Sequence, residues 1–191
     1  GGAATTNDIN LAKRMQLLRV HGISRETESI DNHPAGKWGY EQQDLGFNYR
    51  MTDIQASLGV SQINRLSEII EKRNLLFLEY QNLLFNSQVE LLNIPKNVIS
   101  SVHLAVVQIP SISSHKHREI FKGLRESSIG VQLHYYPVHL QPFYKKLGFC
   151  SSMFPTAEDY AKKSISLPLY PGLGLKDQKR IVKTLINLIR N

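Results

Sequence analysis

The 191-residue sequence contains a single cysteine, Cys150, and no long hydrophobic run. One cysteine excludes an internal disulfide framework and is typical of a reducing compartment, so we expect a cytoplasmic location. The longest uninterrupted apolar stretches have four residues, as at 104–107, whereas a membrane-spanning helix needs about 20. We therefore expect no membrane partner. Cys150 has no base near it in the sequence and is interpreted as a structural residue.

The charge distribution does not indicate a nucleic-acid site. The 23 lysines and arginines outnumber the 16 aspartates and glutamates and give a net charge of +7, but the basic residues are scattered. No Cys/His finger spacing or aromatic RNA-binding motif accompanies them, so we expect no nucleic-acid partner. A diffuse positive surface equally suits a phosphorylated small molecule. The hydrophobic fraction of 41% and the charged fraction of 20% are typical of a soluble globular protein.

The first 50 residues combine short regular segments with one long irregular segment. Residues 3–6 suggest the end of a strand, and a helix is predicted from a cap at Asn7 or Asp8 to about Val20. A glycine follows and ends this helix. Residues 23–47 show little periodicity. A loop of this length inside a compact domain is usually functional or disordered.

The remaining sequence predicts alternating helices and strands. From Thr52 or Asp53, apolar residues recur near the helical period as far as Leu83, which predicts one helix much longer than average. Beyond it, the predicted strands cover residues 102–109, 129–135 and 166–170, and the predicted helices cover residues 115–126, 157–164 and 177–189. No internal repeat is visible, so these elements indicate a small α+β domain.

One turn carries groups that suit an anion. Residues 45–56 (LGFNYRMTDIQA) place an amide and a guanidinium just before a predicted helix begins. Asn48 and Arg50, together with backbone donors, suit phosphate oxygens near a helix N-terminus. The alternative is that Asn48 is an ordinary turn residue and that Arg50 pairs at the surface. The residues alone favour this second interpretation.

A second segment is rich in polar aromatic side chains. Residues 131–144 (VQLHYYPVHLQPFY) contain two histidines and three tyrosines, which could line a polar ligand pocket or transfer protons. His134 and His139 lie five residues apart with no carboxylate between them, so no metal site is predicted. Helix capping alone explains the histidine within residues 17–22, and the proline-flanked segment 164–171 is interpreted as structural.

Five segments occur in an order that resembles one known family. They are residues 1–8 (GGAATTND), 19–22 (RVHG), 46–56 (GFNYRMTDIQA), 134–139 (HYYPVH) and 166–171 (SLPLYP). Together they resemble the DegT/DnrJ/EryC1/StrS sugar-nucleotide aminotransferases, which use pyridoxal 5′-phosphate (PLP), over essentially the whole chain. Residues 40–50 (YEQQDLGFNYR) are most similar to one branch, the UDP-4-amino-4,6-dideoxy-N-acetyl-β-L-altrosamine transaminases of pseudaminic acid biosynthesis.

The resemblance implies a fold and a reaction. The fold would be the α/β fold of fold-type I PLP-dependent transferases, usually a homodimer with active sites at the subunit interface. The reaction would transfer an amino group from glutamate to a 4-keto (UDP-)sugar nucleotide, with PLP as the cofactor. Residues 1–50 would be the C-terminal remnant of the large cofactor-binding domain, with a substrate loop at about 23–47. Residues 51–191 would be the small α+β domain, entered by a long helix.

The resemblance also implies that the catalytic lysine is missing. In the family a Schiff-base lysine precedes a Gly-Glu-Gly-Gly segment, and Gly1 and Gly2 resemble the end of that segment. We therefore expect the lysine to lie upstream of Gly1, and we expect the isolated chain to hold no catalytic residue and to be inactive. The alternatives are a non-catalytic dimerisation or binding module, or the remnant of a broken gene.

The resemblance assigns roles to six residues. It implies that Asn48 reaches the cofactor phosphate of the partner subunit and that Arg50 lies beside it on the cofactor side. It places four further residues near the substrate, and these are Tyr49, His134, Tyr135 and His139. We also expect residues 1–50 to be poorly ordered in isolation, because a cut through the large domain removes the sheet that they would pack on.

Overall fold

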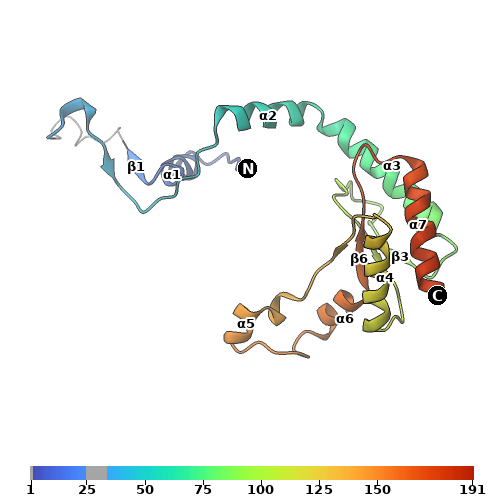
Figure 1. Ribbon diagram of the computed structural model, residues 1–191. Helices are drawn as coiled ribbons and strands as arrows, with labels where there is room; N and C mark the ends of the chain where they lie inside the picture. The colour runs from blue at the N-terminus through green and yellow to red at the C-terminus, as the bar shows by residue number, and fades with distance from the viewer. Residues whose placement is uncertain (1, 25–33) are drawn as a thin grey trace. The chain divides into compact units, whose positions relative to one another are not determined.

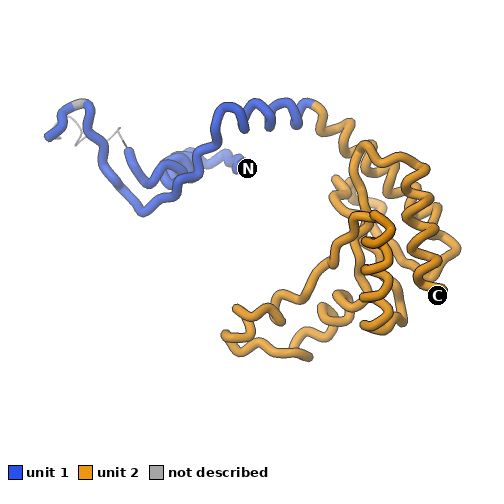
Figure 2. Tube along the Cα trace, in the orientation of Figure 1, with its two compact units in different colours: residues 1–64 blue, residues 65–191 orange. Residues whose placement is uncertain are grey.

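The computed structural model describes residues 2–24 and 34–191, so the middle of the predicted loop, residues 25–33, lies outside the described residues. The chain divides into two compact units, residues 1–64 and residues 65–191 (Figure 2). The division predicted from the sequence, between residues 50 and 51, lies N-terminal to this boundary and stays a prediction. Among the described residues, no helix is long and apolar enough to cross a membrane.

The N-terminal unit begins with a capped helix. The helix α1, Ile9–Arg19, starts after Asp8, whose side chain accepts hydrogen bonds from the backbone N–H groups of Asn10 and Leu11 at 2.8 and 3.2 Å. This confirms the predicted helix and its cap. The strand predicted at residues 3–6 is wrong, because these residues are irregular and pair with no other strand in the described part of the chain.

Short elements follow in the N-terminal unit. Strand β1, Ile23–Ser24, pairs antiparallel with β2, Glu41–Gln42, and the 3₁₀ helix η2, Gly36–Trp38, lies between them in sequence. Helix α2, Asp53–Asn64, ends the unit (Figure 1). Of the residues between 2 and 64 whose burial is described, only Gly22 and Gly39 are buried. The described part of this unit therefore has no core of side chains.

The long helix predicted after Thr52 is interrupted. Helix α2 stops at Asn64 and helix α3, Leu66–Leu84, starts after Arg65, which has φ −106° and ψ 5°. These angles lie outside the helical region, so the hydrogen-bond ladder is broken at this residue. No proline or glycine marks the break, and the apolar spacing continues through it. Sequence periodicity alone therefore predicts one helix where there are two.

The C-terminal unit is built on a four-stranded antiparallel sheet. Its strand order is β3-β4-β6-β5, and the central pair β4 and β6 is joined by four residue pairs, from Ala105 with Leu167 to Gln108 with Ser164. The strands are β3, Glu90–Leu91; β4, Ala105–Gln108; β5, Gln132–Leu133; and β6, Ser164–Leu167. Every residue of β6 is buried. The sheet is therefore covered at its centre rather than exposed on one face.

Three helices pack together in this unit. Helix α7, Leu175–Arg190, contacts both α3 and α4, Ser114–Glu126. Its buried residues recur at spacings of three and four, and they are Gln178, Ile181, Val182 and Leu185. This spacing forms one apolar face of an amphipathic helix. Helices α5, Pro142–Lys146, and α6, Pro155–Lys163, and the 3₁₀ helix η3, Val138–Leu140, lie in the connection from β5 to β6 (Figure 1).

Polar groups of α3 hold the surrounding chain in place. The Tyr80 side chain is fully buried, and its hydroxyl donates to the Pro168 carbonyl at 2.8 Å. Burial raises the pKa of Tyr80, so the hydroxyl stays protonated and keeps this bond. The guanidinium of Arg73 donates to three backbone carbonyls, those of Val102, His103 and Leu169. These bonds connect α3 to the segment just before β4 and to the segment just after β6.

We expect Leu124→Ala to destabilise the C-terminal unit. Leu124 is fully buried on α4, so the change removes packed side-chain atoms and leaves a cavity, at a cost of about 2–5 kcal/mol in the free energy of unfolding. Urea unfolding followed by circular dichroism measures the loss. The matched control is Leu78→Ala on α3, where the side chain is half exposed, and we expect a much smaller change.

Candidate functional site

The turn that carries Asn48 is fixed to the end of α1 by backbone hydrogen bonds. The Phe47 N–H donates to the Leu18 carbonyl at 2.7 Å, and the Tyr49 N–H donates to the Arg19 carbonyl at 2.9 Å. The His21 N–H donates back to the Phe47 carbonyl at 2.8 Å. The segments 19–22 and 46–50, which the sequence presents as separate motifs, therefore form one structure.

Two glycines permit this close approach. A Cβ on Gly46 would overlap the Gly22 nitrogen and the His21 carbonyl carbon, and a Cβ on Gly22 would overlap the Asp44 carbonyl oxygen. Both His21 and Gly22 adopt the left-handed conformation, with φ 67°. The sequence interpretation of His21 as a simple helix cap is therefore incomplete, because the residue also pairs with the turn.

The turn presents polar donors to solvent. The Arg50 Nε donates to the Asn48 Oδ1 at 3.2 Å, which leaves the amide N–H₂ of Asn48 and the terminal N–H groups of Arg50 without partners in the described part of the chain. All three residues from Asn48 to Arg50 are exposed, and the Tyr49 ring stacks on Phe47 with 4.8 Å between centroids. A guanidinium beside an amide is a donor set that fits a phosphate group.

Helix α2 begins directly after this turn with a capping box. The Thr52 hydroxyl accepts from the Gln55 N–H at 3.3 Å, and the Gln55 side chain accepts from the Thr52 N–H at 3.1 Å. Of the two caps predicted from the sequence, Thr52 has the capping contacts and Asp53 is the first helical residue. The donor set of Asn48 and Arg50 therefore precedes the positive end of a helix dipole.

His134 and Tyr135 lie together at the end of β5 in the C-terminal unit. The His134 Nδ1 lies 3.1 Å from the Ser166 hydroxyl, and its ring lies 4.3 Å from the Tyr135 ring. Burial lowers the pKa of His134, which favours the neutral ring at pH 7. Tyr135 is exposed. A neutral imidazole with one nitrogen engaged can offer its other nitrogen to a ligand hydroxyl.

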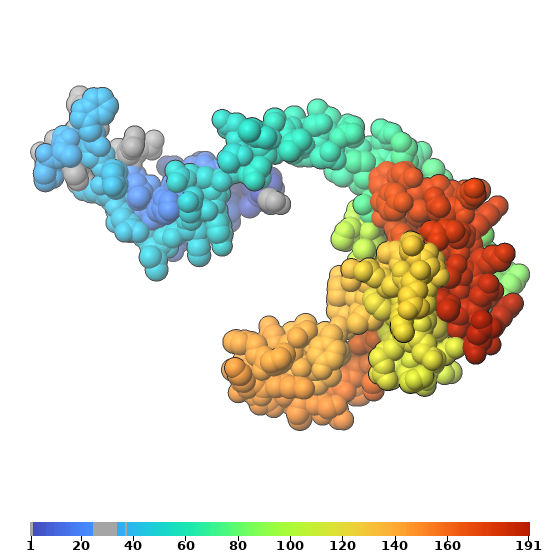
Figure 3. Space-filling model, in the orientation of Figure 1, coloured from blue at the N-terminus to red at the C-terminus, as the bar shows by residue number. Residues whose placement is uncertain are grey.

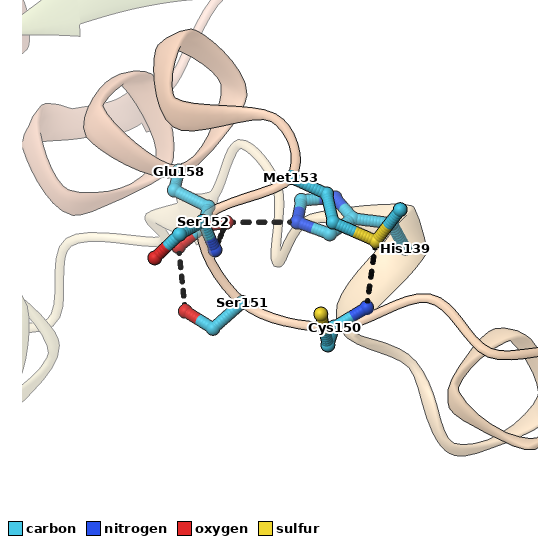
Figure 4. A network of polar contacts seen from close by, with 6 residues as sticks. All are labelled: His139, Cys150, Ser151, Ser152, Met153 and Glu158. Atoms are coloured by element: carbon cyan, nitrogen blue, oxygen red, sulfur yellow. Dashed lines mark hydrogen bonds and ion pairs between the residues drawn. The ribbon is translucent and has the colours of Figure 1, made fainter.

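His139 is engaged inside the protein. Its side chain is buried on η3, with Nε2 3.0 Å from the Glu158 Oε1 and the ring edge-on to Phe154 at 4.9 Å. Glu158 also accepts from the Ser151 hydroxyl at 3.0 Å and from the Ser152 N–H at 2.7 Å (Figure 4). The hydrogen bond from His139 is the main cause that lowers the pKa of Glu158, so the carboxylate is ionised.

This network was not found from the sequence. Glu158 lies 19 residues from His139, and no local spacing connects them. The structure therefore gives His139 a role in joining η3 to α6, and the substrate contact expected for it stays a prediction. The residues at 48–50 and those at 134–139 belong to different units, so each group is described by itself. Among the described residues, no group of three or more His, Cys, Asp or Glu could hold a metal.

Comparison with known proteins defines the class. The mixed α/β fold of this chain corresponds to about half of the length of each matched structure of a fold-type I PLP-dependent aminotransferase. The sequence profile of the DegT/DnrJ/EryC1/StrS aminotransferase family matches residues 1–186, and the chain belongs to this family. This confirms the family predicted from the five ordered segments.

The relatives that this chain matches are longer than the chain itself. It is 34% identical to the uncharacterised protein MJ1066 of Methanocaldococcus jannaschii, over 99% of the chain and 50% of the relative. It is 30% identical to the Campylobacter jejuni UDP-4-amino-4,6-dideoxy-N-acetyl-β-L-altrosamine transaminase, over 99% of the chain and 48% of the relative. The chain therefore spans about half the length of the curated relatives it matches.

Solved structures show the same coverage. The PMP-form of the sugar aminotransferase Spr1654 from Streptococcus pneumoniae matches with a TM-score of 0.88 and 26% identity, over 99% of this chain and 47% of that chain. The Helicobacter pylori aminotransferase PseC, involved in the biosynthesis of pseudaminic acid, matches with a TM-score of 0.85 and 25% identity, over 97% of this chain and 47% of that chain. A PLP-form of Spr1654 also matches.

We expect Gly46→Ala to disrupt the turn that presents Asn48. The added methyl group overlaps backbone atoms of Gly22 and His21, which cannot move as a flexible side chain would. Amide hydrogen exchange measures the effect, and we expect faster exchange at Phe47 and His21. The control is Gly59→Ala in α2, where a Cβ meets nothing within 4 Å and leaves these rates unchanged. Equal rates in both variants would contradict the packing argument.

We expect Glu158→Gln to destabilise the C-terminal unit in a pH-dependent manner. The pKa of Glu158 is lowered in the native state from an ordinary value of 4.5, so its ionised form stabilises the fold above that pH. This contribution is lost as the pH falls through the native pKa. Urea unfolding should therefore give a lower free energy of unfolding for the variant than for the unaltered chain at pH 7. This difference should narrow near pH 3. Glu126→Gln, at an exposed site on α4, is the control, and the gap at pH 7 should be small there.

Proposed function

We propose that this chain is part of a PLP-dependent aminotransferase that moves an amino group from glutamate to a 4-keto (UDP-)sugar nucleotide. The family match over residues 1–186 is the observation that carries the proposal. The identity of 30% to the Campylobacter jejuni transaminase supports the branch that serves pseudaminic acid biosynthesis. The relatives are about twice as long, so the activity belongs to a longer assembly of which this chain is one part.

Asn48 and Arg50 are proposed to hold the cofactor phosphate. Their unpaired N–H groups point to solvent from a turn that the backbone fixes to α1. The Arg50–Asn48 hydrogen bond holds the amide oxygen, so the Asn48 N–H₂ group remains available as a donor. When bound, PLP supplies an electron sink for the carbon that exchanges the amino group. In the dimer proposed for the intact enzyme, this turn serves the partner's cofactor.

The residues at the end of β5 are proposed to contact the substrate. His134 holds the Ser166 hydroxyl with Nδ1 and can meet a sugar hydroxyl with Nε2. Tyr135 offers an exposed ring and hydroxyl beside His134. Tyr49 offers the same groups in the turn at residues 46–50 of the N-terminal unit. His139 would act by holding the segment 138–158 in place through Glu158. The alternative, a non-catalytic binding module, keeps these surfaces but has no turnover.

We expect the isolated chain to have no aminotransferase activity. The lysine that forms the Schiff base with the cofactor in the family is expected outside residues 1–191. The amide of Asn48 cannot form this covalent bond. The assay supplies PLP, glutamate and a UDP-4-keto sugar and follows amino transfer. Turnover together with one specific lysine adduct after borohydride reduction would contradict this expectation.

In an assembly completed by the missing half of the fold, we expect activity and a role for Asn48. Asn48→Ala removes a hydrogen bond to a charged phosphate and should weaken PLP binding by about 10- to 100-fold. Asn97→Ala, at an exposed position between β3 and β4 in the C-terminal unit, is the control and should leave PLP affinity unchanged. An active assembly in which both variants bind PLP equally would refute the phosphate role.

A further inference from the structure

Ser166 brings a hydroxyl to His134 from the centre of the sheet. It lies on β6, where it pairs with Val106 of β4 on one side and with Gln132 of β5 on the other. Directly paired residues of an antiparallel sheet share a face, and every second residue of a strand returns to that face. His134 follows Gln132 by two residues, and its Nδ1 lies 3.1 Å from the Ser166 Oγ. The sheet register therefore determines this contact.

The Ser166 hydroxyl has one hydrogen-bond partner among the described residues, and this partner is His134. Ser166 is 4% exposed, so the hydroxyl has little access to water. A serine hydroxyl carries one proton to donate and lone pairs that accept. If it accepted a hydrogen bond from Nδ1, its own proton would be buried without an acceptor, which is unfavourable. The favoured arrangement therefore has the hydroxyl donating to Nδ1.

This direction of the hydrogen bond determines where the proton of the imidazole ring lies. A neutral ring carries one N–H, on either Nδ1 or Nε2. Burial lowers the pKa of His134 and favours the neutral ring. The neighbouring rings are those of Tyr135 and Tyr160, and no carboxylate pairs with His134 in the described part of the chain. With Nδ1 accepting from Ser166, the ring proton lies on Nε2.

We propose that Ser166 is a positioning residue that holds His134 in the tautomer protonated at Nε2, so that the site presents a hydrogen-bond donor to its ligand. The ligand atom that meets Nε2 is then an oxygen of the sugar acting as an acceptor. His134 does not serve as a base in this state, because the nitrogen left for the ligand already carries a proton. The sugar as ligand rests on the proposed function, whereas the tautomer rests on the contacts of Ser166.

A ligand can reach the end of β5. His134 is partly buried, and Tyr135 beside it is 63% exposed. Figure 3 shows the residues that follow β5, in yellow-orange to orange, at the surface of the C-terminal unit. The ring can therefore meet a ligand while Ser166 stays covered by protein.

The test is ¹⁵N NMR of the full 191-residue chain with labelled histidine rings. The chain has seven histidines, so loss of one set of signals in His134→Gln assigns those of His134. At neutral pH we expect a protonated Nε2 and an unprotonated Nδ1. Ser166→Ala should give a mixture of both tautomers, because nothing then selects one. Ser166→Thr keeps a hydroxyl and should restore the single tautomer.

Ser164→Ala is the matched control. Ser164 lies on the same strand, two residues away, and is also buried, but its hydroxyl has no hydrogen-bond partner in the described part of the chain. Its removal should leave the His134 signals unchanged. A proton on Nδ1 in the unaltered chain would overturn the proposal, and this measurement needs no variant. A single Nε2–H tautomer in Ser166→Ala, or the same mixture in Ser164→Ala, would also overturn it.

A second arm identifies the ligand atom. Addition of UDP-N-acetylglucosamine should shift the Nε2–H proton signal of His134, whereas UDP alone should not. An equal shift with UDP alone would overturn the assignment of a sugar oxygen. No shift with either compound would contradict the substrate contact in the proposed function, but the tautomer measured without ligand would still decide the role of Ser166.

Discussion

The close backbone approach between the turn at residues 44–50 and the end of α1 determines where the proposed phosphate donors lie. Gly46 and Gly22 make the approach possible, since a side chain at either position would overlap backbone atoms. The hydrogen bonds of Phe47 and Tyr49 to α1 then fix the direction of the chain between them. Asn48 and Arg50 are exposed because the residues around them are held, and α2 starts at a defined point after them. The proposed phosphate site therefore gains its order from this backbone pairing.

The C-terminal unit is held together by a core of packed side chains rather than by backbone pairing of turns. Its strands are short, and its stability comes from side chains of α3, α4 and α7 packed with the central strands β4 and β6. Some buried polar groups in this unit are satisfied by backbone carbonyls, as at Tyr80, or by a carboxylate, as at His139, whereas the Ser164 hydroxyl and the Gln178 Oε1 have no partner in the described part of the chain. The connection from β5 to β6 leaves this core, and Glu158 anchors it through three hydrogen bonds. The segment that carries the proposed substrate contacts is therefore held by these polar contacts together with aromatic contacts such as that of His139 with Phe154.

Local signals predicted the helices well and the tertiary contacts poorly. Periodicity and caps gave α1, α4 and α7, because each has a side-chain cap or one apolar face that the sequence shows directly. The interruption at Arg65 and the two-residue strand β3 have no comparable signal, since backbone angles and pairing with β4 determine them. The strand expected at residues 3–6 was wrong because a strand needs a neighbour. The link between His139 and Glu158 was missed because it joins residues distant in sequence, whereas the motif around Asn48 was visible because its turn is local.

The composition of α2 also has a consequence for the lifetime of the chain in a cell. Uncovered apolar helices are recognised by chaperones and proteases, and they promote aggregation when no partner is present. Helix α2 carries one charged residue, Asp53, and exposes Ile54, Leu58, Val60 and Ile63, so it favours aggregation wherever nothing covers it.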